Sequence, residues 1–189
     1  MTSTTDTPDQ PAPAMDWQTF EAAWQFEETV YRLTRASLQL LGESAFKDQA
    51  FSAFAFNASL PTISLSVDTR PDNKELEYYP PDWSNECIEV DVPAIGALWE
   101  QGYATIADAF GELIERVDDE QLDAIDAGCM HSLRKVMVRL ETSRAFDHIK
   151  TCPRVWTLVT QVDADTDEEE RLLDQVRLTA PPATPKTSW

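Results

Sequence analysis

Apolar residues recur every three or four positions along much of the chain, which places them on one face of an α-helix. The first such stretch begins at Asp16, a residue type that caps helix N-termini, and ends at Gly42, a residue type that ends helices. The pattern predicts one long amphipathic helix over this stretch. Its apolar positions are Trp17, Phe20, Ala23, Trp24, Phe26, Val30, Tyr31, Leu33, Leu38, Leu40 and Leu41.

The next part of the chain predicts two β-strands. Residues 51–56 are almost all apolar, which is typical of a strand buried on both faces. Residues 63–67 alternate between an aliphatic residue and serine, which is the period of a half-buried strand. Pro61 separates the two stretches, so we expect them to form an antiparallel hairpin.

Helical spacing returns in the second half of the chain. Pro93 suits the first turn of a helix, and the apolar spacing continues to Val117. Three glycines weaken this helix, so the pattern fits either one helix or two shorter ones. Asp118 and Gln121 have the spacing of a capping box, which predicts the start of a further helix. Its apolar face extends at least to Leu140.

The remaining pattern completes an α+β domain. Residues 155–162 predict a third strand, and residues 166–177 predict an acidic helix. This order indicates an α+β fold, in which a small antiparallel sheet of three or more strands packs against several α-helices. We expect this single domain to span 16–178. A disordered leader over 1–15 and a disordered, proline-rich tail over 179–189 are expected because both ends have few apolar residues to bury.

Negative charge is the strongest compositional signal. The 189 residues include 34 Asp plus Glu but only 15 Lys plus Arg, which gives a net charge of −19. A surplus of this size repels nucleic acid and anionic lipid and attracts basic partners. We therefore expect a basic protein partner, and neither nucleic-acid nor membrane binding.

Three features favour a cytoplasmic location. The chain has no run of about 18 apolar residues, which a membrane-spanning helix requires. Its first residues lack the basic and apolar regions of a signal peptide. Its three cysteines are few and odd in number, so they do not form a disulfide framework, and they fit a reducing compartment.

Acidic residues gather in two clusters, one between the two middle helices and one at the start of the last helix. We interpret both as a landing surface for a basic protein, because electrostatic attraction raises association rates and selectivity. The alternative is a solvated face that keeps the protein soluble in a salty cytoplasm. The candidate partner-binding residues are Glu112, Glu115, Asp118, Asp119 and Asp123 in the first cluster and Asp163, Asp165, Asp167 and Glu168 in the second.

Metal sites find little support in the sequence. The acidic run at 163–167 resembles the start of a calcium loop but lacks the later glycine and the bidentate glutamate. Cys129, His131, His148 and Cys152 could offer four zinc ligands. Cys129 and His131, however, would point about 200° apart on a helix. We therefore expect no metal and no cofactor.

The sequence contains no recognisable set of catalytic residues either. Only two histidines occur, and no nucleophile elbow, zinc-protease motif or Walker motif is present. Carboxylates are so abundant that some pair must lie close together by chance, so their number is no argument for acid–base chemistry. We expect a protein that is not an enzyme, with a carboxylate-site enzyme as an alternative.

The most distinctive local string is Tyr78-Tyr79-Pro80-Pro81-Asp82-Trp83. Its rings could pin a stiff loop onto the domain, or Tyr78 and Tyr79 could form an aromatic hot spot for a partner. With the helix and two strands before it and the leucine-rich helix and late strand after it, this string resembles that of an uncharacterised bacterial family. The family has a tyrosine-rich segment that ends in Glu/Asp-Trp, and it is similar to immunity proteins of toxin systems.

The sequence thus predicts a cytoplasmic, non-enzymatic acidic binding protein. The resemblance implies an immunity protein that neutralises a basic bacterial toxin such as a nuclease, and it implies no catalytic residues. An acidic surface would act by occupying the groove that otherwise holds phosphates. The alternative is a DNA mimic or regulatory adaptor that binds a basic host protein.

Overall fold

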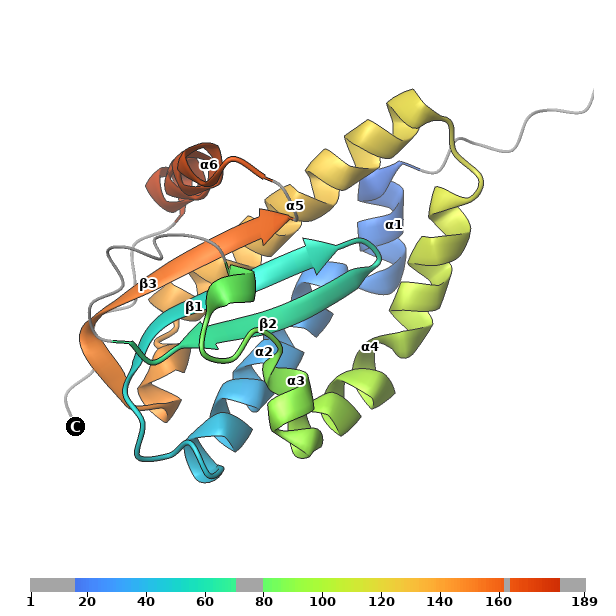
Figure 1. Cartoon of the computed structure of the whole chain (residues 1–189). Coiled ribbons are helices and arrows are strands. Elements are labelled where there is room, and N and C mark those ends of the chain that lie inside the picture. The colour runs from blue at the N-terminus through green and yellow to red at the C-terminus, as the bar shows by residue number, and fades with distance from the viewer. Residues whose placement is uncertain (1–15, 71–79, 162–163, 181–189) are drawn as a thin grey trace, which may run out of the picture.

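The computed structural model describes residues 16–70, 80–161 and 164–180, and it confirms the expected α+β fold (Figure 1). The predicted leader and nearly all of the predicted tail lie outside the described residues. The elements, in chain order, are α1 (Trp17–Trp24), α2 (Phe26–Glu43), β1 (Phe51–Ser59), β2 (Thr62–Asp68), the short 3-10 helix η1 (Pro80–Asp82), α3 (Ile88–Asp91), α4 (Pro93–Ile114), α5 (Asp119–Thr142), the 3-10 helix η2 (Ala145–His148), β3 (Thr151–Gln161) and α6 (Thr166–Thr179).

The first predicted helix is two helices. Asp16 caps α1 as expected, since its carboxylate accepts the Thr19 N–H at 2.8 Å. The expectation of one continuous helix is wrong, because Gln25 adopts a left-handed conformation with φ 49° and separates α1 from α2. That conformation costs about 1–2 kcal/mol. The turn brings Trp17 to 5.0 Å from Phe26, measured between ring centroids, and such aromatic packing offsets the cost.

The sheet has the order β2-β1-β3 and is mixed. β1 and β2 form the predicted antiparallel hairpin, closed by the pair Ser59 and Thr62. β3 instead pairs parallel to β1, with Ala55 opposite Leu158, which corrects the expectation of a wholly antiparallel sheet. The path of the chain explains the difference. α4 runs away from the end of the sheet where β1 begins, and α5 runs back to it, so β3 starts beside the start of β1 (Figure 1).

The two faces of the sheet are covered differently. Helices α2, α4 and α5 lie on one face, where Phe54 and Phe56 of β1 join the main hydrophobic core (Figure 1). On the other face, Ala55 packs with Trp83 and Trp156 in a smaller cluster. Helix α6 lies beside β3 and α5. Because both faces are covered, β1 is buried on both sides, as its apolar sequence predicts.

Helix α4 does not break at its glycines, so the first of the two possibilities is the one observed. It is continuous from Pro93 to Ile114. A Cβ atom at Gly102 would lie 2.6 Å from a methyl carbon of Leu33, so this glycine allows α2 and α4 to approach each other. The predicted capping box at the start of α5 is confirmed. The Gln121 N–H donates to the Asp118 carboxylate at 2.9 Å, and the Gln121 side chain accepts the Asp118 N–H at 3.3 Å.

The segment after η1 covers the outer edge of β2. Asn85 exchanges two backbone hydrogen bonds with Val67, at 2.9 and 3.2 Å. The Glu89 carboxylate, on the short helix α3 that the sequence pattern did not predict, accepts the Leu65 N–H at 2.7 Å. Burial raises the pKa of Glu89 above its ordinary value. Part of the edge of the sheet is therefore closed by the chain itself.

A buried carboxylate fixes the same segment at the end of β2. The Asp68 side chain is fully buried and bonds to Arg70, with a closest N–O distance of 2.6 Å. The Ser84 hydroxyl donates to Asp68 at 2.6 Å. Burial alone would raise the pKa of Asp68, but the hydrogen bonds from Arg70 and Ser84 outweigh burial and lower it to about 2. Asp68 is therefore charged in the folded protein at neutral pH.

Candidate functional site

The first predicted acidic cluster lies where α4 turns into α5, at the end of α4 and the start of α5 (Figure 1). We call it the junction surface. Its first six members are exposed and the last is half-buried. The two helices bring them together because one short turn joins the end of α4 to the capping box of α5. The junction surface consists of Glu112, Glu115, Asp118, Asp119, Glu120, Asp123 and Asp126.

Most of this negative charge is uncompensated. The stretch 112–126 contains one cation, Arg116, whose guanidinium pairs with Glu112 at 2.8 Å. Within the described residues, the other six acids of the junction surface form no ion pair. Several cations elsewhere are already paired within the chain. The junction surface therefore presents a strong local negative field to a partner.

An apolar groove adjoins the junction surface. This end groove has a volume of about 430 Å³ and lies between the end of β1, the end of α4 and the start of α5. Phe110 and Ile125, both buried, contribute to its apolar lining. Asp123 and Asp126 line it as well, and the Gln161 amide donates to the Asp126 carboxylate at 2.7 Å. An apolar hollow lined by carboxylates suits an apolar side chain that is flanked by basic residues.

The second predicted cluster is used locally to a large extent. Asp165 caps α6, because its carboxylate accepts the Glu168 N–H at 3.2 Å. Glu168 in turn accepts the Nε–H of Arg171 at 2.7 Å, and this hydrogen bond is the largest cause that lowers the Glu168 pKa. Asp167 is exposed in the first turn of α6, where a negative side chain interacts favourably with the helix dipole. Asp163 lies outside the described residues.

One acid of the second cluster points into the protein. Glu169 is buried and pairs with Arg134 of α5 at 2.5 Å. Glu170 accepts the Trp156 indole N–H at 3.4 Å. The start of α6 is therefore an attachment of this helix to α5 and β3, and the junction surface is the stronger candidate for partner binding.

Tyr78 and Tyr79 also lie outside the described residues, so the hot-spot interpretation stays a prediction. The string they begin ends on the sheet. Trp83 is 5% exposed and meets Trp156 edge to face, with ring centroids 5.8 Å apart. This end of the string packs as a buried ring, as one of the two interpretations expects.

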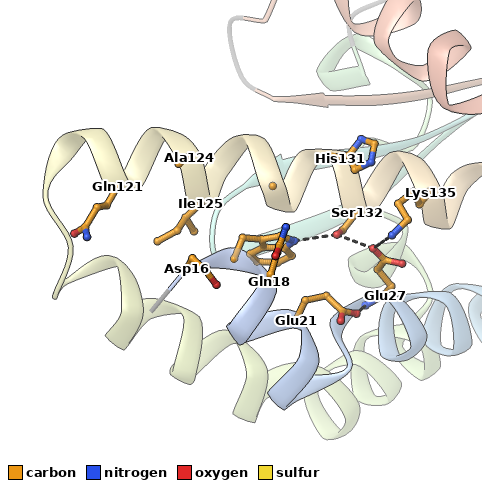
Figure 2. A pocket seen from close by; sticks show the side chains of 12 residues that line it. Asp16, Gln18, Glu21, Glu27, Gln121, Ala124, Ile125, His131, Ser132 and Lys135 are labelled. Carbon is orange, nitrogen blue, oxygen red and sulfur yellow. Dashed lines mark hydrogen bonds and ion pairs between the residues drawn. The ribbon is translucent and has the colours of Figure 1, made fainter. Parts of the chain in front are cut away.

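A second groove, which the sequence pattern did not indicate, lies between α1 and α5 (Figure 2). This α1–α5 groove has a volume of about 590 Å³. A series of polar side-chain contacts connects residues that line this groove. The Trp17 indole N–H donates to the Ser132 hydroxyl at 3.0 Å, and that hydroxyl donates to the Glu27 carboxylate at 2.9 Å. The Lys135 ammonium group pairs with the same Glu27 oxygen.

The α1–α5 groove depends on contacts that are far apart in the sequence. Trp17 and Ser132 are separated by 115 residues. Helix α5 can approach the Trp17 ring because position 128 is glycine, and a Cβ there would lie 2.5 Å from the ring. Gly128 inside an otherwise helical pattern is the one local signal of this approach that the sequence offers.

The candidate metal ligands are not assembled into a site. Cys129 is buried in the core, where burial raises the pKa of its thiol, whereas His131 is exposed. The His148 ring lies beside the Gln39 amide, 3.5 Å between the two nitrogens. Within residues 16–70, 80–161 and 164–180, no group of three or more His, Cys, Asp or Glu residues could hold a metal ion.

Comparisons with known proteins found no relative whose site could be compared with this one. A scan against protein-family models found no match, and searches of curated proteins and of solved structures found none either. In the part of the chain that the structure describes, no helix combines the length and the apolar character needed to cross a membrane.

Proposed function

We propose that this protein is a non-enzymatic acidic binding protein whose junction surface docks a basic protein. The observation that carries the proposal is the combination of unpaired, exposed carboxylates with the apolar end groove that Asp123 and Asp126 line. The carboxylates would speed and orient the encounter, and the end groove would exclude water from the contact. The second cluster is a weaker candidate for partner binding, because several of its acids cap α6 or form ion pairs within the protein.

A basic toxin such as a nuclease is one partner of this kind. A protein that binds nucleic acid needs a basic surface that contacts phosphates, and the junction surface would occupy it in place of the phosphates. The immunity role implied by the sequence resemblance is therefore a specific form of the same proposal. A regulatory adaptor would use the same surface on a basic host protein.

The proposal is tested by removing charge from the junction surface alone. The junction triple variant combines Glu115→Gln, Asp119→Asn and Asp123→Asn, three exposed residues whose side chains carry no described ion pair. Immobilised wild-type protein should retain a basic protein from a lysate of the source organism at about 50 mM salt and release it at about 500 mM. With that partner purified, calorimetry should give at least a tenfold weaker Kd for the junction triple variant.

A matched control separates the surface from the total charge. The control variant combines Glu43→Gln, Asp48→Asn and Glu100→Gln, which changes the net charge equally at exposed positions elsewhere. We expect its Kd to stay within about twofold of wild type at the same salt. Equal weakening by both variants, or none by either, would contradict the proposal. The identity of the retained protein distinguishes a toxin from a host protein.

A further inference from the structure

We infer that the α1–α5 groove binds an extended basic segment of the protein partner, with one arginine seated on Glu27. The inference rests on the proposed function, because it names the part of a basic partner that this protein would hold. It concerns a different surface from the junction surface, so each can be tested without the other.

The shape of the groove suits an extended chain. Its lining on α5 runs from Gln121 to Lys135, which is about 20 Å at the helix rise of 1.5 Å per residue. An extended segment of about six residues has that length. The groove also begins beside the junction surface, because Gln121 shares the capping box with Asp118. A basic segment that leaves the junction surface could therefore continue along α5.

Glu27 is fixed in position before any partner arrives (Figure 2). Its carboxylate accepts the Ser132 hydroxyl, and Ser132, which is 3% exposed, is itself held by the Trp17 indole. The Glu27 backbone N–H donates to the Glu21 carboxylate at 3.2 Å, which fixes Glu21 at the start of α2. A carboxylate ordered by the fold loses little freedom on binding, so less of the interaction energy is spent on ordering it.

Charge favours a cationic guest in this groove. Asp16, Glu21 and Glu27 line it with three carboxylates, against the single ammonium group of Lys135. The Glu27 side chain is 25% exposed, so it can be reached from solvent while Lys135 holds one of its oxygens. Arginine suits this position better than lysine, because its planar guanidinium offers several donors and is more weakly hydrated than an ammonium group.

The inference is tested with a defined probe. The probe is a fluorescent peptide of alternating alanine and arginine, about six residues long, and its partner probe has citrulline in place of each arginine. Citrulline keeps the shape and removes the charge. At about 50 mM salt, fluorescence anisotropy should show binding of the arginine peptide and at least tenfold weaker binding of the citrulline peptide. Binding should also shift the NMR signal of the Trp17 indole N–H.

Neighbouring glutamates on α2 supply the matched variants. Glu27→Gln keeps an acceptor for Ser132 but removes the charge, and we expect a Kd for the arginine peptide at least tenfold weaker. Glu28→Gln should leave the Kd unchanged, because Glu28 pairs with Arg139 outside the groove lining. Lys135→Gln removes the resident cation and should tighten binding severalfold.

The outcomes separate this inference from the proposed function. Peptide binding that is equal in wild type and Glu27→Gln but lost in the junction triple variant would overturn the inference and leave the proposed function intact. Equal binding of the arginine and citrulline peptides would also overturn it. Binding that Glu27→Gln abolishes, together with partner binding that the junction triple variant leaves unchanged, would support the groove and contradict the junction surface.

Discussion

Gly128 lets helix α5 lie directly on the Trp17 ring. A Cβ atom there would lie 2.5–2.7 Å from the first atoms of the Trp17 side chain, which cannot move without displacing α1. Alanine normally stabilises a helix interior by about 1 kcal/mol relative to glycine, whereas overpacking costs about 1–3 kcal/mol. We expect Gly128→Ala to lower the free energy of unfolding by up to about 2 kcal/mol in urea titrations, because overpacking outweighs the gain in helix propensity.

Gly111 supplies the matched control for this prediction. It lies in α4, and a Cβ atom there would meet nothing within 4 Å. Gly111→Ala should therefore raise the free energy of unfolding by about 0.5–1 kcal/mol. A gain of stability in both variants would show that Trp17 is not held against α5 as described.

Asp68 should make the free energy of unfolding depend on pH in the acid range. Its pKa is about 2 in the folded protein, below about 3.9 in an unfolded chain. The charged carboxylate therefore stabilises the fold above about pH 4, and this contribution is lost as the pH falls toward 2. The loss amounts to about 2 kcal/mol. The gap in unfolding free energy between wild type and Asp68→Asn should narrow by that amount between pH 5 and pH 2.5, at roughly constant salt.

Urea titrations at several pH values measure that gap. Asp48→Asn, an exposed acid that no described ion pair uses, is the control and should follow wild type throughout. Parallel curves for wild type and Asp68→Asn across the acid range would contradict the role given to Arg70 and Ser84.

At the scale of elements, the attachment of α6 depends on a buried ion pair. Arg134 of α5 and Glu169 of α6 are both about nine-tenths buried and lie 2.5 Å apart. Removing one partner leaves the other charge buried and uncompensated. We expect Arg134→Met to lower the free energy of unfolding by about 3–5 kcal/mol, and the double variant with Glu169→Leu to recover most of that loss.

The exposed pair between Arg116 and Glu112 provides the comparison. Because both side chains are largely in solvent, Arg116→Met should change the unfolding free energy by less than about 1 kcal/mol. Chemical denaturation of wild type, Arg134→Met, Glu169→Leu, their double variant and Arg116→Met measures these differences. Additive losses in the Arg134 and Glu169 cycle would mean that the two charges do not interact as the geometry indicates.

Elements with local signals were predictable from the sequence. The hairpin, the start of α4 at Pro93 and the capping box of α5 each depend on a few neighbouring residues. The break at Gln25 and the parallel pairing of β3 were not predictable. Gln25 turns because distant aromatic rings pack together, and β3 follows the direction in which α5 returns the chain.

Candidate sites divide in the same way. The acids of both clusters could be named from the sequence, because charge is a property of composition. Which acids stay free could not, since Glu169 pairs with a residue 35 positions away. The α1–α5 groove could not be predicted either, because Trp17, Glu27 and Ser132 meet only after three helices have packed.

At the scale of the whole molecule, the cations are distributed so as to leave one end strongly negative. Arg70, Arg134, Lys135, Arg139 and Arg177 are all engaged in ion pairs away from the junction surface. The net charge of −19 is therefore uneven over the surface. An uneven charge orients an approaching basic protein as well as attracting it. The comparison of the junction triple variant with the control variant tests this property.

The closed edge of β2 affects how the protein behaves when crowded with copies of itself. Amide groups on an open sheet edge can recruit a strand from another molecule and start a cross-β fibril. At Leu65 and Val67 these groups are already bonded to Glu89 and Asn85. Fibril growth at this edge first requires that the Asn85–Glu89 segment detach. The folded chain is therefore protected there from templated aggregation, even in salt that screens the repulsion between its acidic surfaces.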